Sequence, residues 1–170
     1  NRTKKKILTL ALLALVLAAL AWYLLRDPRS TQSVSMEPAP AGAVSASGIH
    51  WHPEISITIK GEKQAVPAGI GLGMQYAGHP LYDPMMMMTN MHTHDGSGQI
   101  HWEVMEGPVG EDDVRLKQFF AVWAKKFTRE CIFDYCSPEG ALTFRVNGQD
   151  NQDFENYLVK DKDKIEIIFN

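Results

Sequence analysis

The sequence predicts an α+β fold in which one N-terminal transmembrane helix precedes a small domain of strands and a single helix. Ile7 to Leu25 is an apolar run of about 28 Å as a helix, long enough to cross a bilayer. Two stretches, 55–59 and 164–169, alternate apolar and polar residues as strands do. A third stretch, 116–127, carries apolar residues at helical spacing. These patterns divide the 170 residues into an anchor at 1–26, a flexible linker at 27–47 and a domain at 48–170.

The charges around the apolar run predict its orientation. Four basic residues precede it, namely Arg2, Lys4, Lys5 and Lys6. This flank favours a cytoplasmic N-terminus, and it places a single-pass protein in the inner or cell membrane with its domain on the periplasmic or extracellular side. A cleaved signal peptide ending at Ala19-Leu20-Ala21 is the alternative. The membrane, contacted through residues 7–25, is thus an expected partner.

The charge of the domain excludes one class of partner. Residues 48–170 hold 11 Lys and Arg against 18 Asp and Glu, which gives a net charge near −7. An acidic domain lacks the basic surface that nucleic acids require, so no nucleic-acid partner is expected. The same charge is compatible with binding cations.

The order of elements in the domain predicts its topology. Residues 55–59 and 64–70 form a predicted hairpin, a helix starts near Val114 after a cap at Asp112 or Asp113, and strands follow at 141–146 and 164–169. This order is that of the β-grasp (ubiquitin-like) fold, in which the first and last strands pair in parallel at the centre of the sheet. The fold class predicted for residues 48–170 is therefore a β-grasp-like domain with an inserted histidine-rich hairpin.

Residues 91–103 are predicted to form that hairpin. Asp95-Gly96-Ser97-Gly98 is typical of a tight turn with Gly96-Ser97 as its loop. This register pairs Asp95 with Gly98, His94 with Gln99 and His92 with His101. One face then carries three histidines, His92, His94 and His101, and the other face carries Thr93, Ile100 and Trp102.

These histidines and a second pair, His50 and His52, predict a metal site. Alternate residues of a strand point to one face, so each His-x-His presents two imidazoles together. Nitrogen-rich sites hold Cu²⁺ tightly and also suit Zn²⁺, and copper is favoured over zinc because the domain carries a methionine cluster as well as the histidines. Asp95 and Glu103 are candidate additional ligands or acceptors that orient the rings. The prediction requires His50 and His52 to meet the hairpin face; a polar face turned to a partner protein is the alternative.

Sulfur-containing residues leave two further alternatives open. Met85-Met86-Met87-Met88 can fill gaps or form a contact surface, or its thioethers can favour Cu⁺. Cys131 and Cys136 are the only cysteines, and outside the cytoplasm a disulfide closing a short loop is favoured over two thiolate ligands.

Other chemistries are poorly supported by the sequence. The glycines at 69, 71 and 73 lack the lysine of a phosphate loop and are expected at a strand end. Ser97, His92 and Asp95 are too crowded on one turn to align as a catalytic triad. His79 has no neighbour at ligand spacing and is assigned to a loop. We therefore expect no catalytic residues and a binding or structural protein rather than an enzyme.

Three blocks of the sequence resemble an uncharacterised family of exported or membrane-anchored prokaryotic proteins. They are Ile-His-Trp-His-Pro with Val-Pro-Ala-Gly-Ile-Gly (49–71), Met-His-Thr-His-Asp-x-Ser-Gly-x-Ile-His-x-Glu (91–103), and Leu-x-Gln-Phe-Phe-x-Val-Trp (116–123) with Val-Asn-Gly (146–148). The resemblance implies the domain boundaries and no particular reaction. A glycine is expected after the tryptophan in such proteins; Ala124 stands there, which allows the helix to continue to Phe127.

Two functional hypotheses follow. The first is a membrane-anchored protein that binds copper or zinc through His50, His52, His92, His94 and His101, in metal binding, delivery or sensing. The second is an accessory or structural subunit of a larger membrane complex, respiratory or photosynthetic, with or without bound metal.

Overall fold

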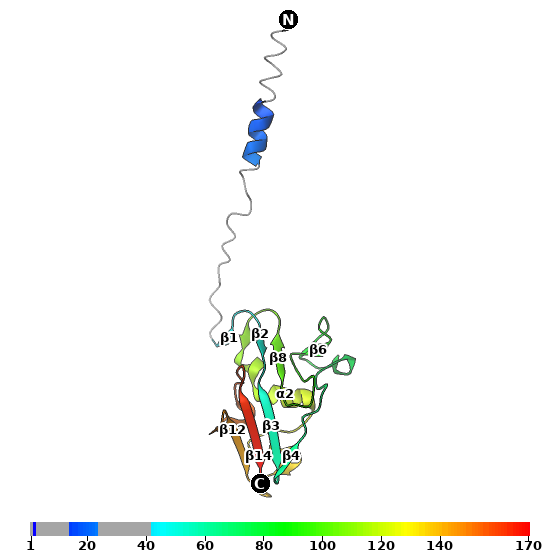
Figure 1. Ribbon diagram of the computed structural model, residues 1–170, viewed down its shortest axis with the longest axis vertical. Helices are drawn as coiled ribbons and strands as arrows, with labels where there is room; N and C mark the ends of the chain where they lie inside the picture. Colours follow the sequence, from blue (N-terminus) through cyan, green and yellow to red (C-terminus); the bar gives the residue numbers. More distant parts are fainter. Residues whose placement is uncertain (1, 3–13, 24–41) are drawn as a thin grey trace. The chain divides into compact units, whose positions relative to one another are not determined.

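A computed structural model describes residues 2, 14–23 and 42–170 of the chain (Figure 1). The chain divides into two compact units, 1–37 and 38–170. In the first unit, residues 14–23 are helical. The predicted anchor at 1–26 and linker at 27–47 lie for the most part outside the described residues.

The predicted transmembrane helix is corrected by the described residues. Within the described ranges, no helix is both long and apolar enough to span a membrane. This finding overturns the predicted transmembrane helix and, with it, the predicted single-pass location in the inner or cell membrane. Of the residues 7–25 that were expected to contact the membrane, 7–13 and 24–25 lie outside the described residues.

A mixed five-stranded sheet forms the centre of residues 42–170, and its strand order is β13-β12-β14-β3-β4. Its members are β3 (Glu54–Ile59), β4 (Glu62–Gln64), β12 (Leu142–Val146), β13 (Gln149–Asp150) and β14 (Lys164–Phe169). β14 runs parallel to β3 with Lys164 opposite Glu54, so the predicted pairing of the first and last strands is confirmed. Apolar and polar residues alternate in β3 and β14, so one face of each strand is buried. That face carries Ile55, Ile57, Ile59, Ile165, Ile167 and Phe169.

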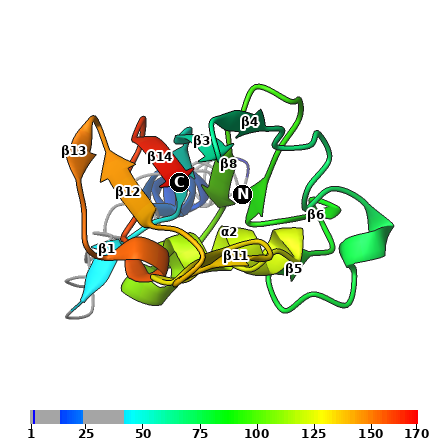
Figure 2. The same cartoon turned by 90° about the horizontal axis from the view of Figure 1, so that it is seen from below.

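Helix α2 (Leu116–Trp123) supplies the other side of this core. Figure 2 shows α2 on one side of the sheet. Its buried residues, Leu116, Phe119, Phe120 and Val122, belong to the same apolar cluster as the isoleucines of β3 and β14. The apolar residues at helical spacing in this stretch therefore pack in the core.

The remaining strands form four small sheets. One joins β2 (Ile49–Trp51), β8 (His101–Val104) and β7 (Met91–His92). The two-stranded sheets pair β1 (Ala43–Ser45) with β9 (Val109–Gly110), β5 (Tyr82–Asp83) with β6 (Met88–Thr89), and β10 (Cys131–Ile132) with β11 (Tyr135–Cys136). Short 3-10 turns lie at η1 (Met74–Tyr76), η2 (Glu111–Val114) and η3 (Phe154–Asn156). β1 lies inside the predicted linker, so regular structure begins before Gly48.

The predicted fold class is therefore wrong. Strands make up most of the regular structure, and the one α-helix within residues 42–170 has eight residues. In place of an α+β fold with a transmembrane helix and a β-grasp-like domain, the described chain is a strand-rich fold. The predicted second strand is also shorter than expected, because Pro67 and the positive φ of Gly69 and Gly71 turn the chain out of the sheet after Gln64.

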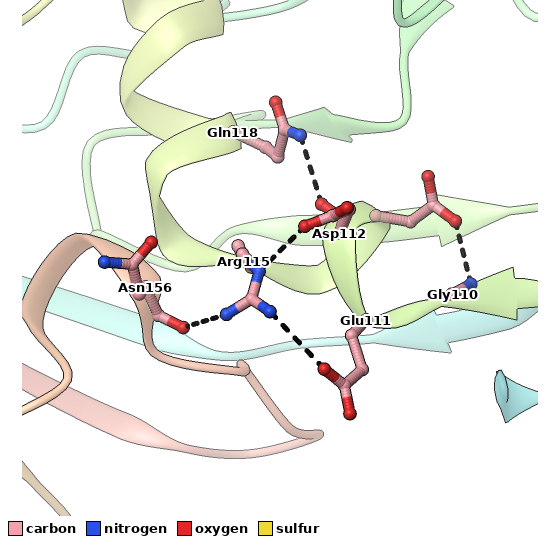
Figure 3. A network of polar contacts seen from close by, with 7 residues as sticks. Gly110, Glu111, Asp112, Arg115, Gln118 and Asn156 are labelled. Carbon is pink, nitrogen blue, oxygen red and sulfur yellow. Dashed lines mark hydrogen bonds and ion pairs between the residues drawn. The ribbon is translucent and has the colours of Figure 1, made fainter. Parts of the chain in front are cut away.

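The start of α2 is held by polar contacts rather than by a simple cap (Figure 3). Arg115 donates from Nε to Asp112 Oδ1 at 2.8 Å and from Nη1 to the carbonyl of Asn156 at 2.9 Å. Gln118 Nε2 donates to the carbonyl of Asp112, and the backbone N–H of Gly110 donates to Asp113 Oδ2. The predicted cap residues thus close the 3-10 turn η2, and the α-helix begins after it.

The cysteines form the predicted disulfide. Cys131 and Cys136 lie opposite each other in the β10–β11 hairpin and are joined through their sulfur atoms. Oxidised sulfurs leave no thiolate pair for a metal. A disulfide is typical of proteins from oxidising compartments.

Ala124 ends α2 earlier than the sequence suggested. Its φ of 55° and ψ of 38° lie in the left-handed region, and its N–H donates to the carbonyls of Ala121 and Phe120. Helices commonly end in this conformation, usually with glycine. Phe127 is still buried because its ring stacks on Phe120 at 4.7 Å from an extended segment. The apolar residues at helical spacing therefore extend past the end of α2, which is why the sequence predicted a longer helix.

We predict that Ala124→Gly stabilises the protein. Removing the Cβ relieves the left-handed strain, which outweighs the added freedom of the unfolded chain, so the free energy of unfolding should rise by about 0.5–1 kcal/mol. Chemical denaturation of the full chain measures the change. Ala121→Gly, at an exposed site within the same helix, is the matched control and should lower stability by about 1 kcal/mol. Destabilisation by both substitutions would contradict the prediction.

Candidate metal site

The sheet β2-β8-β7 brings the two histidine segments together. His92 lies opposite His101 across the β7–β8 pair, as predicted. His50 lies opposite Glu103 and Trp51 opposite Trp102 across the β2–β8 pair. Residues opposite each other in antiparallel strands share a face. His50 and His52 therefore meet the hairpin face.

Pairing between the two arms of the hairpin ends at His92 and His101 and does not continue to the turn, as had been predicted. The pairings of Asp95 with Gly98 and of His94 with Gln99 do not form; instead, Gln99 bridges Glu54, and Ile55 N–H donates to the carbonyl of Gly98. Gly98 permits this approach, because a Cβ there would lie 2.3 Å from the Ile55 carbonyl oxygen. The second arm of the hairpin therefore pairs with the chain entering β3.

The inward face of the hairpin is as predicted, but the outward face is not uniform. Thr93, Ile100 and Trp102 are fully buried. His92 is also buried, with 1% of its surface exposed, whereas His94 is exposed and His101 is intermediate. Segment 69–72 covers His92: the N–H of Gly69 donates to the carbonyl of Thr93, and the Thr93 N–H donates to that of Ile70.

The glycine run in this segment has a packing role. Gly71 has a φ of 77°, and a Cβ there would lie 2.4 Å from Thr89 Oγ1 and 3.1 Å from the Cβ of His92. Only glycine therefore fits where the segment passes over the buried histidine. From the sequence this run was predicted to end a strand, and no residue pattern indicated that it contacts His92.

The five imidazoles form a continuous group centred on His101. The ring centroid of His101 lies 4.5 Å from that of His94, 4.8 Å from that of His52 and 5.4 Å from that of His92. His50 lies 4.7 Å from His52 and 6.3 Å from His101. His79 is outside this group, and its Nδ1 accepts from the N–H of Leu81.

His92 carries a buried nitrogen without a protein partner. Its Nδ1 lies 3.2 Å from the Thr89 carbonyl, which can only accept, so Nδ1 bears the proton. Its Nε2 then holds a lone pair, and within the described residues it has no hydrogen-bond partner. Burial lowers the pKa of His92, which favours the neutral ring. Neutral imidazole is the form that binds metal ions.

Glu103 orients two further rings. Its Oε1 lies 2.9 Å from Nε2 of His50 and 3.5 Å from Nδ1 of His101. A carboxylate in this place fixes the protonated nitrogens of both rings and leaves His50 Nδ1 and His101 Nε2 as lone pairs. Burial, then the charges of His94 and His52, lower the pKa of His101. Of the two candidate orienting residues, Glu103 therefore contacts histidines directly.

Asp95 has a different role. Its Oδ1 accepts from the backbone N–H of Ser97 at 2.9 Å, which closes the turn. Hydrogen bonding to Ser97 also lowers the pKa of the Asp95 carboxyl. His92 donates to the Thr89 carbonyl, and Asp95 accepts from the backbone of Ser97. The three residues Ser97, His92 and Asp95 therefore form no catalytic triad.

Among the described residues, two groups of histidines lie close enough to hold a metal ion, and they share His101. The inner group is His92, His94 and His101; the outer group is His50, His52 and His101. Within each group the candidate ligand nitrogens lie within 4.8 Å of one another. Bonds of about 2.0–2.1 Å to one ion require shorter separations, so the rings of either group would have to turn toward one another to bind it.

The methionines lie beside this site rather than in it. Met85 is 92% exposed, and Met87 and Met105 are also exposed. Met86, Met88 and Met105 line a groove together with Glu103. In both views the segment containing β6 lies on the side of β8 away from β12 (Figures 1 and 2). Glu103 therefore separates the thioether groove from the imidazoles.

Comparison of the chain with protein-family models, with curated proteins and with solved structures found no match.

We predict that acidification destabilises the metal-free protein from about pH 6.5 downward. The pKa values of His92 and His101 are lowered from 6.5 in the folded state. The unfolded chain therefore binds protons in this range that the folded chain does not, and the free energy of unfolding decreases as the pH falls. Chemical denaturation in a chelator at several pH values measures the slope.

His101→Asn tests the origin of that slope, because His101 is partly exposed and tolerates replacement better than His92. The variant should lose part of the pH dependence between about pH 7 and 5.5. An equal slope in the two proteins, or greater stability on acidification, would contradict the assignment.

Proposed function

We propose that residues 42–170 bind a transition metal ion through His92, His94 and His101, with His50 and His52 beside them. The buried, unpartnered Nε2 of His92 carries the proposal. A buried acceptor without a partner costs about 1–3 kcal/mol, and a metal ion bound there would remove that cost. His94 and His101 lie 4.9 and 5.4 Å from the His92 ring, near enough to share the ion.

The hydrogen bonds of the His92 and His101 rings support the proposal, because they hold each ring with one nitrogen free to bind a metal ion. The Thr89 carbonyl and the Glu103 carboxylate each take a ring N–H and leave the opposite nitrogen free. Metal-binding histidines usually donate their second ring N–H to such groups. The negative charge of the domain also favours a cation.

Copper is our preferred ion, ahead of zinc. A site of imidazole nitrogens binds Cu²⁺ more tightly than the other divalent first-row metals. The neighbouring thioethers of Met86, Met88 and Met105 would suit Cu⁺. We propose a role in metal binding, delivery or sensing rather than in catalysis.

Equilibrium dialysis against Cu²⁺ and Zn²⁺, followed by metal analysis of the full chain, tests the proposal. The wild-type protein should retain copper in preference to zinc. His94→Gln/His101→Gln, which changes one exposed and one partly exposed ligand, should lose affinity by about 100-fold or more, since even the loss of outer groups costs 10–100-fold. His79→Gln is the matched control and should bind as wild type. Equal and negligible copper in all three proteins would overturn the function.

Glu103→Gln tests the orienting role. The amide keeps the shape of the side chain but loses the charge that holds His50 and His101, so copper affinity should fall by about tenfold. The fold should be retained by circular dichroism, because Glu103 lies on the outward face. Unchanged affinity would show that the carboxylate does not prepare the ligands.

A further inference from the structure

The five histidines cannot all bind one ion in the arrangement described. Among the ring contacts of the described residues, none joins His50 or His52 to His92 or His94. His101 is the one member of both groups. The cluster therefore offers two neighbouring positions, one in the inner group and one in the outer group.

The two positions differ in access to solvent. The side chain of His50 is 63% exposed and that of His101 is 22% exposed, while His92 is 1% exposed. The outer group thus holds no buried histidine, whereas the inner group joins the buried His92 to the exposed His94. An ion arriving from solvent can contact each ligand of the outer group directly, but it reaches the buried His92 only past His94 or His101.

The shared histidine has one nitrogen available. Nδ1 of His101 faces the carboxylate of Glu103, which leaves Nε2 as its ligand atom. One lone pair binds one ion, so the two positions cannot be filled together through His101.

We propose that the outer group is an entry position, and that an ion bound by His50 and His52 passes through His101 to the inner group, one ion at a time. This inference rests on the proposed metal-binding function. Each transfer exchanges one imidazole ligand for another on the same ion, without a change of oxidation state. His101 stays bound while an outer histidine leaves and His94 or His92 joins.

The experiment measures copper exchange in the full chain by stopped flow. Trp51 and Trp102 adjoin the cluster, so Cu²⁺ binding should quench tryptophan fluorescence. In His50→Gln/His52→Gln the association rate and the rate of release to a chelator should both fall about tenfold, leaving Kd within about threefold of wild type. A pathway removed from both directions leaves the equilibrium unchanged. The single variant His50→Gln should change both rates in the same direction by less.

Each contrary result has a separate meaning. Unchanged rates would overturn the entry role, and faster release with weaker Kd would make His50 and His52 permanent ligands instead. Two copper ions per chain at saturation would overturn the single-ion transfer. No quenching and no copper in wild type would contradict the metal-binding function itself, whereas normal rates in the variant would contradict only the entry position. His79→Gln, which removes a histidine outside the cluster, should match wild type in every measurement.

Discussion

The burial of Trp102 determines how the candidate metal site is built. Its ring is fully buried, and its Nε1 donates to the carbonyl of Asp113 at 3.0 Å. Since strand side chains alternate, this forces His101 and Glu103 to the opposite face of β8. Trp51 pairs with Trp102 from β2, which turns His50 to the same outward face as Glu103. One buried indole therefore fixes the register that gathers the polar residues.

The buried His92 is the point where this arrangement departs from an ordinary polar face. Its partner in the ladder, His101, is partly exposed, but segment 69–72 closes over His92 and Gly71 allows the close approach. The backbone of Thr89 satisfies one ring nitrogen and leaves the other without a protein partner. A buried lone pair beside two further imidazoles is a costly arrangement unless something binds there. The proposed metal ion would bind this lone pair.

The sequence was informative where local patterns decide structure. Alternation predicted β3 and β14, and the order of elements predicted their parallel pairing. The His-x-His motif with its turn predicted that His92 faces His101. It failed where distant segments compete. The hairpin opens because its second arm pairs with the start of β3, and α2 stops because Ala124 takes a left-handed conformation. The fold class was wrong because strands rather than helices make up most of the regular structure of the described residues, where apolar spacing overestimated the length of α2. Thr89 acts through its backbone carbonyl, which no residue pattern reveals.

The proposed role of His92 Nε2 as a metal ligand is tested most directly by ¹⁵N NMR of labelled imidazoles. In the metal-free protein, His92 should be the tautomer protonated at Nδ1, with an unprotonated Nε2. One equivalent of Zn²⁺, used as a diamagnetic probe, should shift the Nε2 resonance of His92 together with one nitrogen each of His94 and His101. A proton on Nε2, or an Nε2 resonance that does not respond to the ion, would contradict the account.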